Sequence, residues 1–97
     1  MESQLSKAEK QTYIDNLVQN LPLLRKRLGL TQAELAQRVG TTRQTLTAIE
    51  TGQRPLSWAN YLSFILVFQS NPPTKILLDA LDIFPQIVRS YLLFDKK

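Results

Sequence analysis

The sequence of 97 residues contains no cysteine and no histidine. Without cysteine there is no disulfide, no thiolate metal site and no cysteine nucleophile, and an intracellular setting is favoured. Without histidine, the serine–histidine triad, imidazole metal ligands and the commonest general base are excluded as well. We therefore expect no catalytic residues, no metal site and no cofactor, and we predict that the protein is not an enzyme.

Long apolar runs are also missing. The longest covers residues 64–68, far short of the roughly 20 residues that a membrane span needs. The chain does not begin with a cationic stretch followed by an apolar one, so no signal peptide is predicted. From the length and the ordinary globular composition we expect a single domain over residues 1–97, without membrane contact and located in the cytoplasm.

The positive charge is concentrated in the middle of the chain. The net charge is +4 for the whole sequence and +4 for residues 21–57, against −1 for residues 1–20 and +1 for residues 58–97. A local cationic surface fits a polyanionic partner. If the protein binds a nucleic acid, the middle third is the expected contact surface.

Glycine is rare, and no segment alternates apolar and polar residues for long, so the sequence predicts an all-α fold. An N-terminal helix is expected over residues 6–20, where Ser6 and Glu9 form a capping-box pattern. Pro22 predicts a break or kink near residues 20–22, followed by a second helix through Leu28.

Residues 31–52 predict a helix, a tight turn and a second helix. Thr31 and Glu34 form another capping box, and Gly40 supplies the residue that tolerates a positive φ at the turn. The second helix is expected to begin after Thr42 and to end near Thr51. An apolar helix capped by Ser57 should follow, broken at residues 71–73, with two short helices at about 74–82 and 85–94.

The outward residues of the second helix suit base recognition in the major groove. The arginine fork of Arg43 matches guanine O6 and N7, and the amide of Gln44 matches adenine N6 and N7. The complete set of predicted base-contacting residues is Thr42, Arg43, Gln44, Thr47 and Ala48.

Other residues suit contacts with the DNA backbone. Gln32 lies at a predicted helix N-terminus, which favours phosphate binding. Arg38 and Arg54 add positive charge, and Thr41 precedes the second helix. These four residues are the predicted phosphate contacts, which supply affinity without sequence choice.

Residues 28–46, with the sequence LGLTQAELAQRVGTTRQTL, resemble the helix-turn-helix of the Cro/repressor family, also called XRE-like, and in particular the DNA-binding domains of its phage repressors. The resemblance rests on residues at the family's expected spacing, which are Gln32, Ala36, Gly40, Ile49, Glu50 and Gly52. It implies a five-helix lambda-repressor-like domain over residues 21–70. The residues outside it form an extra N-terminal helix (6–20) and a C-terminal helical extension (71–97).

The resemblance also implies a function. Family members act as dimers on near-palindromic double-stranded DNA operators, with half-sites about one DNA turn, roughly 34 Å, apart. By position, Gln32 is implied to contact phosphate and to brace the recognition helix, and Arg25 and Glu50 are implied to form a structural ion pair. Arg43 and Ala48 replace glutamines of the phage repressor domain, so the operator should differ, with guanine opposite Arg43.

The apolar residues beyond residue 73 leave the interpretation open. They either complete the core of the monomer or form the interface of a homodimer, and the dimer is favoured because a palindromic operator needs one. The first hypothesis is a dimeric transcriptional repressor. Two alternatives are an antitoxin-type DNA-binding protein whose extra helices bind a toxin, and a helical interaction module without DNA binding.

Overall fold

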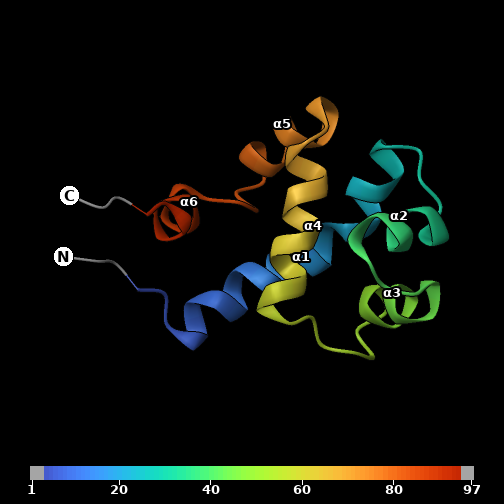
Figure 1. Ribbon diagram of the computed structural model, residues 1–97, viewed down its shortest axis with the longest axis horizontal. Helices are drawn as coiled ribbons and strands as arrows, with labels where there is room; N and C mark the ends of the chain where they lie inside the picture. Colours follow the sequence, from blue (N-terminus) through green and yellow to red (C-terminus); the bar gives the residue numbers. More distant parts are fainter. Residues whose placement is uncertain (1–3, 95–97) are drawn as a thin grey trace.

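The computed structural model describes residues 4–94, which form six helices and no strand, so the all-α prediction is confirmed. The helices are α1 (Lys7–Arg27), α2 (Gln32–Val39), α3 (Arg43–Glu50), α4 (Trp58–Gln69), α5 (Pro72–Ala80) and α6 (Gln86–Leu92). The molecule measures 43 × 28 × 21 Å along its principal axes. Figure 1 shows α2 and α3 at one end of the long axis and α6 at the other, with α1 and α4 between them.

The prediction of a separate helix over residues 6–20 is wrong. Helix α1 runs without interruption for 21 residues and contains Pro22 in its interior. Leu21 and Leu24, on either side of the proline, are both fully buried. Burying these side chains stabilises the helical path by a few kcal/mol, which offsets the hydrogen bond that proline cannot donate. The helix therefore crosses the expected boundary at residue 21.

Apart from the second helix predicted after Pro22, which is part of α1, the predicted helix starts agree with the structure with one exception. Both capping boxes form, from Ser6 with Glu9 and from Thr31 with Glu34. Helix α5, however, begins at Pro72 instead of residue 74. The first backbone N–H groups of a helix have no partner within the helix, so prolines at its first two positions lose nothing and preset the helical φ.

All six helices contribute to a single core. Because every helix buries at least one apolar side chain, none of them is an independent appendage. The apolar side chains with no exposed surface are Leu17, Leu21, Leu24, Leu35, Leu46, Tyr61, Phe68, Leu78, Ile83 and Val88.

The apolar residues beyond Asn71 divide into two groups. Leu78, Ile83 and Val88 enter the core of the monomer, which realises one of the two possibilities that the sequence left open. A second group stays exposed within the described part of the chain, and the exposed fractions reach 75% for Leu93 and Phe94. The exposed members of this group are Ile76, Leu81, Ile87, Leu92, Leu93 and Phe94.

Helix α6 is attached to the body mainly through side chains. The ammonium group of Lys10 lies 5.4 Å from the ring centroids of both Trp58 and Tyr91, and so joins α1, α4 and α6. Arg89 forms an ion pair with Asp79 at 3.0 Å between Nη2 and Oδ1. These contacts link α6 to α1, α4 and α5, and Val88 adds an apolar side chain of α6 to the core.

Burial of Tyr61 makes the stability of the fold depend on pH in the alkaline range. Its buried hydroxyl donates a hydrogen bond of 2.8 Å to the Ile83 carbonyl, and burial raises its pKa well above the usual range. The folded protein keeps this proton where the unfolded chain loses it, so stability falls as pH rises above about 10. We expect Tyr61→Phe to flatten this fall, measured by urea unfolding at about pH 9 and about pH 11. An unchanged pH dependence in the variant would contradict the assignment.

Among residues 4–94, no helix is both long and apolar enough to cross a membrane. In the same part of the chain, no group of three or more acidic side chains is arranged to hold a metal ion.

Candidate nucleic-acid interface

Helices α2 and α3 form the helix-turn-helix, and their angle is set by buried residues and a tight turn. Leu35 and Ala36 of α2 pack in the core with Leu46 and Ile49 of α3. Gly40 follows α2 with a φ of 82°, in the left-handed region that favours glycine. The turn is closed by a hydrogen bond of 2.9 Å from the Thr41 N–H to the Ala36 carbonyl.

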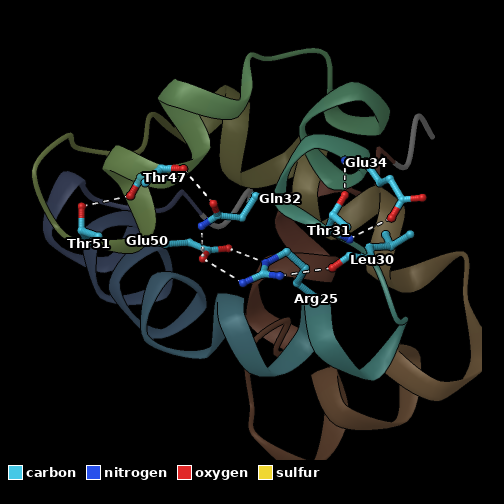
Figure 2. Close-up of polar contacts among 8 residues, drawn as sticks. All are labelled: Arg25, Leu30, Thr31, Gln32, Glu34, Thr47, Glu50 and Thr51. Atoms are coloured by element: carbon cyan, nitrogen blue, oxygen red, sulfur yellow. Dashed lines mark hydrogen bonds and ion pairs between the residues drawn. The ribbon is translucent and has the colours of Figure 1, made fainter.

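A polar network behind α3 joins it to α1 and α2 (Figure 2). Arg25 of α1 binds Glu50 of α3 through two contacts, Nε to Oε2 at 3.0 Å and Nη2 to Oε1 at 3.3 Å. The third donor, Nη1, reaches the Leu30 carbonyl at 3.2 Å, in the loop before α2. The ion pair therefore lies at the place that the family resemblance implied, and it ties three segments together.

Gln32 extends this network along α3. Its side-chain Nε2 donates to Glu50 Oε1 at 3.0 Å, and its Oε1 accepts from the Thr47 hydroxyl at 2.9 Å. Thr51, just after α3, donates from its hydroxyl to the Thr47 carbonyl at 2.9 Å. Gln32 thus contacts α3 at two points one helical turn apart and fixes the rotation of α3 relative to α2.

The start of α2 is held by its capping box. Glu34 accepts a hydrogen bond of 2.9 Å from the Thr31 N–H, and its own N–H donates to the Thr31 hydroxyl at 3.1 Å. The bond from the Thr31 backbone, helped by the Thr31 side chain, lowers the pKa of the Glu34 carboxyl below its usual range. This carboxylate therefore stays charged at neutral pH and stabilises the helix N-terminus on which Gln32 is placed.

The residues predicted to contact bases lie on the surface of α3 or at its start. Thr42, Arg43 and Gln44 are exposed, whereas Thr47 and Ala48 are partly buried. Within residues 4–94, the side chains of Arg43 and Gln44 have no hydrogen-bond or ion-pair partner. Both heads are therefore available to a ligand without breaking an internal contact.

A shallow depression opens between the N-terminal ends of α2 and α3. Its lining includes Arg43 together with Gln32, which places a predicted base contact beside a predicted phosphate contact. Arg25, Thr31 and Ala33 also line it, and neither Thr31 nor Ala33 was among the predicted DNA contacts. The capping-box position of Thr31 was the sequence signal that could have identified them.

The other predicted phosphate contacts are more dispersed. Arg38 lies toward the C-terminal end of α2, where its Nη1 donates to the Glu34 carbonyl at 3.1 Å. Arg54 lies in the loop after α3, and its backbone N–H donates to the Ala48 carbonyl at 3.2 Å. Thr41 lies in the turn and is partly buried. None of these side chains joins the network around Gln32 within the described residues.

The chain belongs to the helix-turn-helix domain family, whose match covers residues 17–70, more than half of its length. The matched segment begins within α1 and ends just after α4, and so contains the whole polar network described above. No solved structure matches the chain.

Sequence comparison also finds a similar protein in Methanothermobacter thermautotrophicus (strain Delta H), described as an uncharacterized HTH-type transcriptional regulator. The two chains are 69% identical over 29 residues, which is 30% of this chain and 42% of the relative. The match thus spans less than half of the relative's length.

Proposed function

We propose that this protein is a sequence-specific regulator of transcription that binds double-stranded DNA by inserting α3 into the major groove. The observation that carries the proposal is the polar network, which fixes α3 to α1 and α2 while Arg43 and Gln44, at its exposed N-terminal end, have no side-chain partner among residues 4–94. A helix presented in this way matches the recognition helix of a helix-turn-helix. The match to a protein described as an HTH-type transcriptional regulator supports the same class of function.

The proposed contacts are of two kinds. Sequence specificity comes from contacts with base edges, made by Thr42, Arg43, Gln44, Thr47 and Ala48. Affinity comes from contacts with phosphates, made by Gln32, Thr41, Arg38 and Arg54. The N-terminal end of α2 contributes to the second kind through its free backbone N–H groups.

We further propose a dimeric repressor of the Cro/repressor (XRE-like) type on a near-palindromic operator. The exposed apolar side chains of the C-terminal extension support an interface, because Leu93 and Phe94 at 75% exposure are costly to leave in water. Sedimentation at micromolar concentration tests the dimer. A species of 11.1 kDa alone would contradict it.

The same exposed residues support a second candidate, an antitoxin-type protein whose extension binds a toxin. This candidate keeps the DNA contacts of α3 and assigns the exposed apolar residues to another protein. It predicts a small partner that co-purifies with the chain and covers Leu92 to Phe94. A stable homodimer that buries those residues without a partner would exclude it.

The experiment that tests the proposed function is selection of binding sites from randomised duplex DNA at near-physiological salt, followed by sequencing. We expect an inverted repeat to be enriched, with guanine and adenine among the preferred bases of each half-site. No enrichment would overturn sequence-specific binding and favour an interaction module without DNA binding.

A comparison of two arginines separates base contacts from phosphate contacts. We expect Arg43→Ala to lower the affinity for the selected site by about 1–3 kcal/mol and to relax the preference at one base pair per half-site. Arg54→Ala should weaken all sequences alike and reduce the slope of log affinity against log salt by about 1 per site. Titrations on selected and scrambled duplexes at several salt concentrations measure both effects. Loss of preference from Arg54→Ala but not from Arg43→Ala would reverse the two assignments.

A further inference from the structure

Helix α6 is joined to the other helices by few contacts. Within residues 4–94, the one hydrogen bond between α6 and another helix belongs to the ion pair of Arg89 with Asp79, whose side chains are 30% and 64% exposed. An ion pair this exposed adds little to stability. Val88 is the one fully buried residue of α6. Because a helix of seven residues does not form alone in water, α6 depends on its remaining contacts with the body.

The segment just before α6 is, in contrast, firmly anchored. Ile83 is fully buried, and its carbonyl accepts the hydrogen bond of 2.8 Å from the Tyr61 hydroxyl. The side-chain Nδ2 of Asn16 in α1 donates to the carbonyls of Leu81 and Asp82, at 3.2 and 3.1 Å. The boundary between the anchored chain and the weakly held helix therefore lies after Ile83. Local opening of α6 beyond this boundary leaves the anchored contacts intact.

Lys10 of α1 supplies the other charged contact with α6. Its Nζ lies 5.4 Å from the ring centroids of Tyr91 in α6 and of Trp58 in α4, and all three side chains are partly buried. Within the described residues, the Lys10 ammonium has no ion-pair partner. It is therefore held by two aromatic faces, whose negative charge density attracts a cation and not a neutral group. The attachment of α6 through Tyr91 thus depends on the positive charge of Lys10.

Acylation is the lysine modification that removes this charge, whereas methylation keeps it. In acylation by a thioester, the neutral amine of Lys10 attacks the carbonyl carbon of the donor. A C–N bond forms, the C–S bond breaks, and the thiolate leaves while the nitrogen loses a proton to it. The product is a neutral amide, which cannot make the cation–π contact with Tyr91.

We infer that Lys10 is a regulatory site for acylation, and that acylation of its Nζ releases α6 from the body of the protein. Release exposes Val88 and Tyr91 next to the apolar residues that are already exposed at the end of α6, so the surface offered to a partner protein becomes larger. Lys10 and α6 lie outside the matched segment 17–70, and Figure 1 shows α6 at the end of the molecule opposite to α2 and α3. The inference therefore does not rest on the proposed binding of DNA.

The experiment uses the full chain in which Nε-acetyl-lysine is incorporated at position 10. Amide hydrogen exchange is measured residue by residue and compared with that of the unmodified chain. Loss of one cation–π contact at a partly buried position shifts the opening equilibrium of α6 by roughly fivefold to tenfold. We therefore expect the amides of α6 to exchange faster by about this factor, with the amides of α3 unchanged.

Three matched chains assign the effect to the contact between Lys10 and Tyr91. Acetylation at Lys7, which is exposed on the same helix and has no aromatic contact within residues 4–94, removes an equal charge and should leave α6 unchanged. Lys10→Arg keeps the charge and should keep the protection of α6. Tyr91→Leu removes the ring and keeps an apolar side chain, so acetylation at position 10 should have no further effect on α6 in this background.

Three outcomes would overturn the inference. The first is unchanged exchange of α6 after acetylation of Lys10. The second is an equal acceleration in α6 and α3, which would show a general loss of stability instead of the release of one helix. The third is an acceleration that persists in the Tyr91→Leu background. If the acetylated chain does not fold, Lys10→Gln, which is also neutral at this position, allows the same comparisons.

Discussion

Glu50→Ala is expected to lower the free energy of unfolding by about 3–5 kcal/mol, because it leaves Arg25 partly buried without its carboxylate. The exposed fractions of the two side chains are 14% for Arg25 and 6% for Glu50, so water replaces little of what is lost. The same change removes the acceptor that orients the Gln32 amide. The contacts between α1, α2 and α3 should therefore weaken together.

Urea unfolding of Glu50→Ala measures this loss, and Asp79→Ala is the matched control. Asp79 also pairs with an arginine at 3.0 Å, but its side chain is 64% exposed, so its removal should cost at most about 1 kcal/mol. If Glu50→Ala does not fold, Glu50→Gln, which keeps the shape and one acceptor oxygen, gives a smaller loss of about 1–3 kcal/mol. Equal losses for Asp79→Ala and Glu50→Ala would show that the buried network does not hold the helix-turn-helix together.

Pro22→Ala is expected to stabilise the protein by about 2 kcal/mol. Proline in a helix interior costs about 3 kcal/mol relative to alanine, and proline restricts the unfolded chain by about 0.4–1 kcal/mol, which the variant gives up. Because α1 is already continuous through Pro22, the new N–H can donate the helical hydrogen bond that proline lacks. For a domain of this size, the melting temperature should rise by roughly 10 °C.

The control for this prediction is the same substitution at the start of a helix. Pro72 occupies the first position of α5, where proline is favourable, so Pro72→Ala should be slightly destabilising, by about 0.4–1 kcal/mol. Thermal unfolding followed by circular dichroism compares the two variants. A destabilised Pro22→Ala would mean that the proline shapes α1 in a way that the core requires.

The structural features that could be predicted from the sequence are those that depend on neighbouring residues. The two capping boxes, the left-handed Gly40 and the boundaries of α2 and α3 follow from interactions within a few residues, and all agree with the structure. The continuous path of α1 through Pro22 could not be predicted in this way, because it depends on the burial of Leu21 and Leu24 in the core. Local propensity favoured a break there, and tertiary packing prevailed.

In the candidate site, too, local features could be predicted from the sequence and contacts between helices could not. Residue types and spacing indicated which side chains face outward on α3, but they did not indicate that the Thr42 and Thr47 hydroxyls are engaged internally. The bond from Thr47 to Gln32 joins residues 15 positions apart, and it depends on the angle between two helices. Side-chain hydrogen bonds of this kind follow only from the assembled structure.

The elongated shape has a consequence for the geometry of the operator. Helices α3 and α6 lie toward opposite ends of a molecule 43 Å long (Figure 1). Two copies joined through α6 would hold their recognition helices farther apart than one DNA turn, at about two turns or roughly 68 Å, whereas copies joined near α3 would span a single turn. For the proposed dimer, the number of base pairs between the half-sites would therefore identify the surface that the two copies share.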